Sequence, residues 1–231
     1  MKLSIIMPVY NEIRTIEEII RRVKEADTSC TKELILVDDA STDGTREFLK
    51  RLESQPQDEI KALFHEVNKG KGAAIRTGLQ QVSGDLVLIQ DADTEYDPSD
   101  YNKLLEPILK GYADAVFGNR FHGGPHRVLY FWHSLGNRCI TTLSNILTNL
   151  NLSDMEVGYK IFRTEVLKKL NLRSNRFGFE PEVTVKLAKL GCRIYEVPIS
   201  YHGRTYEEGK KITWRDGIVA IYCLIRYYFF D

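Results

Sequence analysis

Two aspartates one residue apart, Asp91 and Asp93, follow directly after the apolar segment 85–90. A short apolar run of this kind predicts a buried strand, so both carboxylates are expected at a strand's carboxyl end, where α/β sheets bind ligands. Carboxylates this close repel each other unless a cation neutralises them. A divalent metal ion held by one or two carboxylates and by substrate phosphates suits the pair. Considered alone, the Asp-x-Asp is equally consistent with a loop that caps the following helix.

A second acidic pair follows another apolar segment. Asp38 and Asp39 come directly after residues 33–37, and Glu12 lies shortly after the first apolar segment, residues 3–7. The carboxyl ends of parallel strands meet at one edge of a sheet. We therefore expect these side chains to gather at the same edge as the Asp-x-Asp pair, which favours a ligand site over a helix cap.

Helix-like segments alternate with these strands and cover residues 15–26, 43–52 and 70–82. In the first of them, apolar residues recur at the three- and four-residue spacing of a single helix face. Ser41 or Thr42 is expected to cap the second helix. The alternation of strands and helices predicts an α/β fold with a Rossmann-like, doubly wound and mostly parallel sheet.

The composition excludes several classes of protein. The chain has 231 residues, with 32 basic and 32 acidic side chains and no net charge, so nothing predicts the basic face of a nucleic-acid-binding protein. Four scattered cysteines predict reduced thiols in a cytoplasmic protein rather than disulfides or a zinc site. The apolar strand at the start of the chain argues against a signal peptide.

A glycine-rich segment at residues 70–72 raises the question of a dinucleotide fold. The third small residue of that fingerprint is replaced by Ile75, and the turn after the first strand has no glycine, so the sequence argues against a Rossmann dehydrogenase. No Walker A or Gly-x-Ser-x-Gly sequence is present either. Lys71 has two interpretations: it opens a helix without further function, or it stands at a helix N-terminus that receives phosphate.

Several motifs together resemble family 2 glycosyltransferases of the GT-A fold. They occur in the expected order at residues 8–12, 37–45, 91–93, 118–120, 154–160 and 196–199. The resemblance spans roughly residues 3–211. Within the family it is greatest to the synthases that make dolichyl-phosphate or polyprenyl-phosphate sugars, with mannose or glucose as the sugar. It implies a transferase that takes a hexose from GDP-mannose or a UDP-hexose and passes it, with inversion, to a polyprenyl or dolichyl phosphate.

The resemblance also implies the roles of individual residues. Residues of the nucleotide pocket would be Pro8, Tyr10, Glu12 and Asp38, supported by Asp39. Asp91 and Asp93 would hold Mg²⁺ or Mn²⁺ against the donor diphosphate, and Asp91 would also face the sugar. Arg204 and Lys210 would close over the diphosphate, although Gly209 replaces the family's serine before that lysine. Arg120 would face the acceptor phosphate.

The chemistry of transfer leaves the acceptor open between two classes. A leaving diphosphate is stabilised by the metal ion and by cations such as Arg204. A phosphate acceptor is already ionised and needs cations, for which Arg120 and Arg127 are candidates. A saccharide or protein hydroxyl would instead need a general base, and Asp154 or Glu182 would serve. A third possibility is a nucleotide-sugar-binding protein without activity.

The last segment bears on where the protein acts. We expect a catalytic domain over residues 1–211 and an amphipathic helix over residues 212–231, rich in aromatic side chains. The uncharged run at residues 217–225 is too short to span a bilayer. The helix is expected either to lie in the membrane interface on the cytoplasmic side or to pack on the sheet or in a homodimer.

Overall fold

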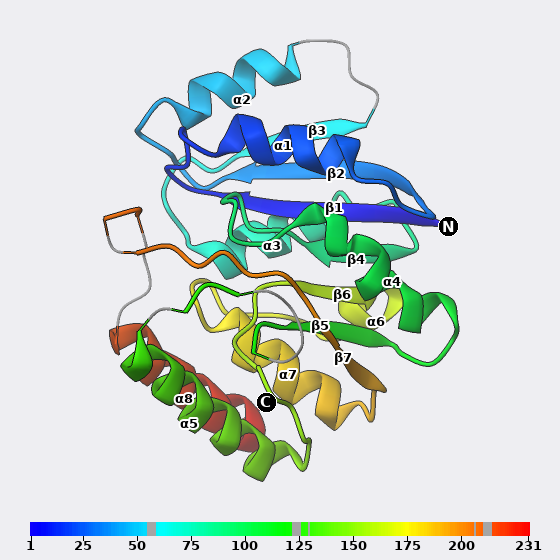
Figure 1. The fold of residues 1–231 in the computed structure, drawn as a ribbon, viewed down its shortest axis with the longest axis vertical. Helices are drawn as coiled ribbons and strands as arrows, with labels where there is room; N and C mark the ends of the chain where they lie inside the picture. Colours follow the sequence, from blue (N-terminus) through cyan, green and yellow to red (C-terminus); the bar gives the residue numbers. More distant parts are fainter. Residues whose placement is uncertain (55–58, 122–125, 129, 206, 210–213) are drawn as a thin grey trace.

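The computed structural model describes residues 1–54, 59–121, 126–128, 130–205, 207–209 and 214–231. Its strands are β1 (Lys2–Val9), β2 (Thr31–Asp38), β3 (Ile60–Phe64), β4 (Leu86–Ile89), β5 (Ala115–Asn119), β6 (Lys160–Arg163) and β7 (Ile194–Pro198). They form one sheet in the order β3-β2-β1-β4-β6-β5-β7 (Figure 1). Only β6 runs antiparallel to its neighbours, so the predicted mostly parallel α/β sheet is confirmed.

The helices are α1 (Ile16–Glu25), α2 (Thr45–Glu53), α3 (Lys71–Leu79), α4 (Tyr101–Leu109), α5 (Phe131–Thr148), α6 (Thr164–Lys169), α7 (Phe179–Lys189) and α8 (Trp214–Phe229). A 3₁₀ turn, η1 (Pro98–Asp100), precedes α4. Helix α3 packs on β1 and β2, α2 packs on β3, and α4 packs on β5 and its neighbours. Helices α5, α7 and α8 pack against one another at the other end of the molecule (Figure 1).

The central strands are buried on both faces, which explains their continuous apolar sequence. All four residues of β4 are buried, and in β1 every residue from Leu3 to Met7 is buried. The register sets Ile6 of β1 beside Ile89 of β4, and Val9 of β1 beside Asp38 of β2. The loops that follow β1, β2 and β4 therefore begin at one edge of the sheet, as predicted.

The predicted caps of α2 are wrong. Gly44 stands at the N-cap with a φ of 98°, a left-handed conformation that glycine adopts without strain. The carboxylate of Asp43 accepts the hydrogen bond from the backbone N–H of Thr45, at 3.0 Å. Ser41 and Thr42 instead hydrogen-bond the loop that follows β1. A tertiary contact between two loops thus takes the polar groups that local sequence assigned to the helix.

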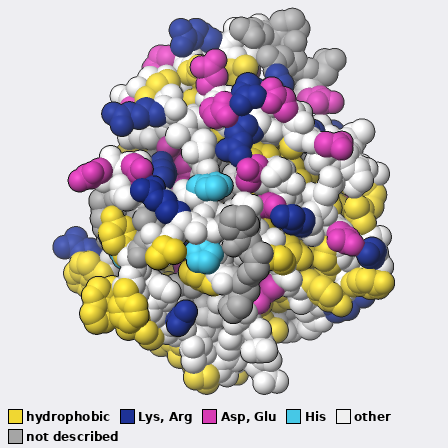
Figure 2. Space-filling model, viewed as in Figure 1, with side chains coloured by type: hydrophobic (Ala, Val, Ile, Leu, Met, Phe, Trp, Pro, Cys, Tyr) yellow, Lys and Arg dark blue, Asp and Glu magenta, His cyan; other side chains and the backbone are white. Residues whose placement is uncertain are grey.

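Helix α8 has one buried side and one exposed side. Its buried residues, among them Leu224 and Tyr227, pack towards α5 and α7. Exposed aromatic residues lie on α8 and at the start of the neighbouring helix α5, and we call them together the α5/α8 face: Phe131, Trp132, Trp214, Tyr222 and Phe229. Figure 2 shows apolar side chains gathered at this end of the molecule, at the lower left. Among the described residues, no helix is both long enough and apolar enough to cross a bilayer.

Candidate active site

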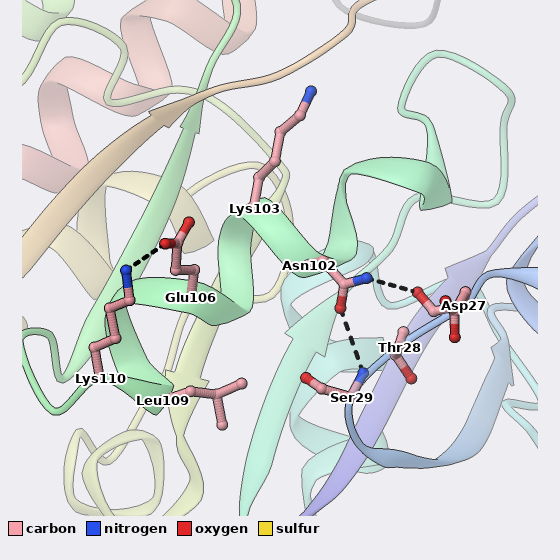
Figure 3. A pocket seen from close by; sticks show the side chains of 8 residues that line it. All are labelled: Asp27, Thr28, Ser29, Asn102, Lys103, Glu106, Leu109 and Lys110. Atoms are coloured by element: carbon pink, nitrogen blue, oxygen red, sulfur yellow. Dashed lines mark hydrogen bonds and ion pairs between the residues drawn. The ribbon is translucent and has the colours of Figure 1, made fainter.

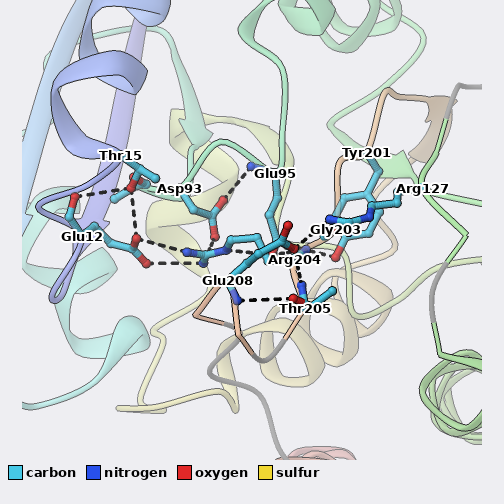
Figure 4. A network of polar contacts seen from close by, with 11 residues as sticks. Glu12, Thr15, Asp93, Glu95, Arg127, Tyr201, Gly203, Arg204, Thr205 and Glu208 are labelled. Carbon is cyan, nitrogen blue, oxygen red and sulfur yellow. Dashed lines mark hydrogen bonds and ion pairs between the residues drawn. The ribbon is translucent and has the colours of Figure 1, made fainter.

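One arginine joins carboxylates from separate loops at the carboxyl edge of the sheet (Figure 4). Arg204, which follows β7, lies among the side chains of Glu12, Asp93 and Glu95. Its Nη2 is 2.6 Å from Asp93 Oδ2, its Nη1 is 3.2 Å from Glu12 Oε2, and its Nε is 3.1 Å from Glu95 Oε1. We call these four residues the Arg204 cluster. Three of them were predicted as site residues, and the fold brings Arg204 to Asp93 across 111 residues of sequence.

Glu95 is the member of the Arg204 cluster that sequence reasoning missed. Its carboxylate accepts hydrogen bonds from the Tyr201 hydroxyl at 2.9 Å and from the backbone N–H of Arg204 at 3.1 Å. A signal was available, because Asp91, Asp93 and Glu95 follow the strand at alternate positions. The second and third of these carboxylates both contact Arg204.

The Arg204 cluster has more negative than positive charge. Burial and the carboxylates of Glu95 and Asp91 raise the pKa of Asp93 to about 8, while the Arg204 guanidinium opposes this shift. Burial works against the charge of Arg204, but Asp93 and Glu12 outweigh it and hold the pKa of the guanidinium well above its usual value. One monocation therefore compensates three carboxylates only in part, and a further cation would be stabilised here.

The donor set fits a hard divalent ion that is shared with a substrate. Asp91 and Asp93 supply the oxygen ligands that Mg²⁺ and Mn²⁺ prefer. Within the described part of the chain, no group of three or more His, Cys, Asp or Glu side chains is arranged as a metal site. The protein thus offers a partial set, which suits an ion that takes its remaining ligands from phosphate oxygens and water.

Lys71 lies beside the first aspartate of the Asp-x-Asp pair. It is the first residue of α3, and its Nζ is 2.8 Å from Asp91 Oδ1 and 3.0 Å from Glu180 Oε1. Burial works against its charge, but the two carboxylates outweigh burial and hold the pKa of Lys71 well above its usual value. Neither of its two predicted interpretations included this contact, because Glu180 comes from α7, more than a hundred residues away.

Asp38 and Asp39 lie where the sequence placed them, at the end of β2, and both are buried. Asp38 accepts hydrogen bonds from the backbone N–H of Ser41. Asp39 accepts the backbone N–H of Gly70 at 2.6 Å and contacts the His65 ring at 2.7 Å. Asp39 thus holds the turn before α3. Pro8 at the end of β1 is half-buried, and Tyr10 beyond it is exposed.

Arg120 forms an ion pair on the other side of the site. Its Nε is 2.7 Å from Asp154 Oδ2 and its Nη2 is 2.7 Å from Asp154 Oδ1, a two-pronged contact with a fully buried carboxylate. Its guanidinium also lies over the Tyr201 ring, 5.3 Å from the centroid. Arg127 is exposed and pairs with Glu208 at 2.7 Å. Lys210, predicted to accompany Arg204, lies outside the described residues.

The two carboxylates considered as general bases are both engaged by other groups. Asp154 is committed to Arg120, as described above. Glu182 is fully buried, accepts the backbone N–H groups of Arg173 and Ser174 at 2.7 Å each, and pairs with Lys186 at 2.8 Å. Glu182 therefore organises the segment before α7.

A surface hollow away from this edge has a different character. It measures about 620 Å³ and lies between the end of α1 and helix α4 (Figure 3). Asn102 crosses it, donating to the Asp27 carbonyl at 3.1 Å and accepting from the backbone N–H of Ser29 at 3.4 Å. These contacts tie a loop to a helix, and none of the residues discussed above lines the hollow.

The fold matches solved structures of known enzymes. Glucosyl-3-phosphoglycerate synthase from Mycobacterium tuberculosis, solved with Mn²⁺, UDP and phosphoglyceric acid, superposes with a TM-score of 0.74 at 20% identity, covering 100% of this chain and 79% of that one. The same enzyme has been solved with Mg²⁺ and UDP, and that structure superposes with a TM-score of 0.72 at 21% identity. These structures establish that the chain has the GT-A fold.

Curated relatives are more similar in sequence. Undecaprenyl-phosphate mannosyltransferase from Micrococcus luteus is 31% identical over 222 residues, covering 91% of this chain and 87% of that protein. Glycosyltransferase AglJ from Haloferax volcanii is 30% identical, covering 87% of this chain and 63% of that protein. Dolichol-phosphate mannosyltransferase from Pyrococcus furiosus is 30% identical, covering 91% and 59%. The chain thus spans less than two thirds of the length of the last two.

Residues 4–171 match the family model described as Glycosyl transferase family 2. This match covers well over half of the chain and agrees with the relatives in sequence and with the fold. The chain belongs to glycosyltransferase family 2, as the sequence motifs predicted.

Proposed function

We propose that this glycosyltransferase moves a hexose, with inversion, from GDP-mannose or a UDP-hexose to a polyprenyl or dolichyl phosphate, using Mg²⁺ or Mn²⁺. The observation that carries the proposal is the Arg204 cluster beside Asp91, where carboxylates outnumber cations at the ligand-binding edge of the sheet. Mannosyltransferases of undecaprenyl phosphate and dolichol phosphate are among the relatives, and they support this acceptor class.

The donor would lie along the carboxyl edge of the sheet. Its nucleotide would bind near Pro8, Tyr10, Glu12 and Asp38, above the turn that Asp39 holds, and its diphosphate would lie near Asp91 and Asp93. A metal ion held there neutralises charge as the diphosphate leaves. Arg204, with Lys210, would contribute a fixed cation to the same departing group. Lys71 would keep Asp91 oriented towards the donor, since it contacts that carboxylate directly.

A phosphate acceptor suits the cations and carboxylates on the other side of the site. It needs no general base, and both candidate bases are already held by other residues. Arg120 uses its Nε and Nη2 on Asp154, and its Nη1 makes no hydrogen bond to any described residue. That terminal nitrogen would receive the phosphate, with Arg127 as a second cation nearer the surface.

A lipid acceptor also requires access from a membrane. The α5/α8 face supplies a surface of exposed aromatic side chains, with Trp132 76% and Trp214 73% exposed. Aromatic and aliphatic residues on one side of a helix are typical of interfacial membrane binding. We propose that residues 1–211 form the catalytic domain and that residues 212–231 help it to contact the cytoplasmic side of a membrane. A homodimer would cover the same face and is distinguished by measuring the molar mass in solution.

Transfer of radiolabelled sugar to a short-chain polyprenyl phosphate tests the acceptor, with free polyprenol and simple sugars as the comparison. We expect transfer to the phosphate alone and a strong loss in Arg120→Ala. Arg51→Ala is the matched control, because Arg51 is exposed on α2. Transfer to a sugar hydroxyl with none to the phosphate would replace this proposal with transfer to a saccharide. Binding of nucleotide sugar without any turnover would point to a non-catalytic binder.

A further inference from the structure

The segment from Asp154 to Gly158 connects the two sides of the site. At its start, Asp154 pairs with Arg120, on the side proposed for the acceptor. At its end, Gly158 lies against Asp91: a Cβ there would stand 2.6 Å from Asp91 Oδ2 and 2.9 Å from Lys71 Nζ. The residue midway between these ends is Glu156, so its position along the chain is between the proposed acceptor and donor groups.

The backbone of this segment is held firmly. The buried Lys160 donates from its Nζ to the carbonyl of Met155 at 2.9 Å and also to the carbonyl of Val157, the two residues that flank Glu156. The N–H of Met155 donates to the Thr141 hydroxyl, and the N–H of Gly158 donates to the Tyr96 hydroxyl. The direction in which Glu156 leaves the backbone is therefore determined.

The side chain of Glu156 has no such partners. Its Oε1 is one of only two buried side-chain polar atoms without a hydrogen bond in the described part of the chain. Its Oε2 also makes no hydrogen bond to a described residue, yet the side chain is only partly buried, so this oxygen remains accessible. An unsatisfied buried polar group destabilises the fold, and such groups are found where a protein keeps them for function.

The charges around Glu156 indicate what it would bind. Its electrostatic neighbours are Glu180 of α7, Lys160 of β6, Arg120 after β5 and Asp154 of its own segment. Burial, and then the charge of Glu180, raise the pKa of Glu156 to about 8. The two acidic neighbours balance the two basic ones, so the position has no excess positive charge to attract a phosphate, and a single available carboxyl group is a poor metal site. A neutral hydroxyl group, which both donates and accepts hydrogen bonds, suits a carboxyl group in either protonation state.

We propose that Glu156 hydrogen-bonds a hydroxyl group of the transferred hexose and thereby helps to select the donor sugar. This inference rests on the proposed function, since it requires the donor sugar to lie between Asp91 and the acceptor. Charged groups lie between Glu156 and Asp91: the charge of Glu180 acts on Glu156, Glu180 Oε1 is 3.0 Å from Lys71 Nζ, and Lys71 Nζ is 2.8 Å from Asp91 Oδ1. The sugar would thus contact Asp91 on one side and Glu156 on the other.

The test separates a contact with the sugar from a contact with the nucleotide. Affinities for UDP, GDP, UDP-glucose and GDP-mannose are measured with Mn²⁺ by calorimetry for the wild type, Glu156→Gln and Glu156→Ala. The wild type is expected to bind either the uridine or the guanosine ligands. For the nucleotide sugar of that base, Glu156→Ala should lose about tenfold to a hundredfold in affinity. Its affinity for the nucleoside diphosphate should stay within about twofold of the wild type.

A deoxy sugar series identifies the hydroxyl group that is bound. The deoxy donor that lacks it should bind the wild type and Glu156→Ala equally well, whereas the parent donor distinguishes them. Glu165→Gln is the matched control, because Glu165 is exposed on α6, and it should bind every ligand as the wild type does.

The stability of the variants guards against a purely structural explanation. If Glu156 serves the ligand, removing its unsatisfied carboxyl group should leave the melting temperature unchanged or raise it, and Glu156→Gln should fold even if Glu156→Ala does not. Equal losses for nucleotide sugar and nucleoside diphosphate, or no loss for either, would overturn the inference while leaving the proposed function standing. A wild type that binds none of the four nucleotides would overturn both.

Discussion

Arg204 should have opposite effects on the binding of a metal ion and on the binding of a diphosphate. In the structure its guanidinium neutralises the carboxylates to which a divalent ion would be attracted. Arg204→Ala removes this competing charge, so Mn²⁺ or Mg²⁺ alone should bind more tightly. The same variant loses a cation that would face the diphosphate, so nucleoside diphosphate in the presence of saturating metal should bind more weakly.

The geometry sets the size of these effects. Arg204 Nη2 lies 2.6 Å from Asp93 Oδ2, and the two side chains are 16% and 13% exposed. A unit charge about 4 Å away contributes about 4 kcal/mol at an effective dielectric constant near 20. Partial access of water reduces this, so we expect roughly tenfold to hundredfold tighter metal binding, or about 1.4–2.8 kcal/mol.

Stability should change as well. Removing one partner of a buried ion pair costs about 3–5 kcal/mol, and the partial exposure of the Arg204 cluster lowers the expected loss to about 1–3 kcal/mol. Because the three carboxylates then lack a cation, added Mg²⁺ should restore more stability to Arg204→Ala than to the wild type.

Calorimetry with Mn²⁺ and thermal unfolding with and without Mg²⁺ provide the measurements. Arg127→Ala is the control, because Arg127 pairs with Glu208 where both side chains are nearly half exposed. It should change the Mn²⁺ affinity by no more than about twofold and leave the melting temperature close to that of the wild type. Metal affinity that falls in Arg204→Ala, or that does not change, would refute the idea that the guanidinium and the ion compete for the same carboxylates.

Three further predictions concern Lys71, Glu156 and Gly158. Lys71→Met leaves the buried carboxylate of Glu180 and the partly buried carboxylate of Asp91 without their cation. We therefore expect a loss of about 3–5 kcal/mol in the free energy of unfolding, measured in urea; a loss below about 0.5 kcal/mol would contradict this. Burial raises the pKa of Glu156 from 4.5 to about 8, so the free energy of unfolding of the wild type falls as the pH rises between these values. The free energy of unfolding of Glu156→Gln relative to the wild type should therefore grow from pH 4.5 to 8 and level off outside that range. A difference that does not depend on pH would show that the carboxyl group stays ionised in the fold. Gly158→Ala places a methyl group 2.6 Å from an Asp91 oxygen and should weaken metal-dependent donor binding by about tenfold. Gly136→Ala is the control, because its Cβ would meet nothing within 4 Å, and it should bind the donor as the wild type does. Equal calorimetric affinities for the two variants would show that Asp91 can shift freely.

The fold was predictable because its signals are local. A strand buried on both faces must be continuously apolar, so residues such as Leu86 and Val87 predict β4 from the local sequence alone. Parallel strands then bring their carboxyl ends to one edge, which is why Asp38 and Asp91 could be placed together. The position of the helix cap was not predictable in this way, since a contact with another loop decided it.

The partners of the charged residues were not predictable from local sequence. Sequence alone predicts that Lys71 either binds phosphate or simply begins a helix, yet Asp91 and Glu180 hold its ammonium group. The family resemblance predicts a phosphate partner for Arg120, and in the structure Arg120 forms an ion pair with Asp154. Charge pairing depends on which loops meet at the edge of the sheet, and those contacts join residues far apart in sequence. Motifs select candidate residues for the site, but they do not show which of these residues neutralise one another.

The anomeric configuration of the product tests most directly whether the enzyme transfers a hexose to a lipid phosphate with inversion. The protein is incubated with Mn²⁺, an α-linked nucleotide hexose and a short-chain polyprenyl phosphate, and the lipid product is characterised by mass spectrometry and NMR. We expect a polyprenyl phosphohexose with a β linkage, formed by the wild type and lost in Asp93→Ala. Free hexose as the sole product, or an α-linked lipid product, would contradict it.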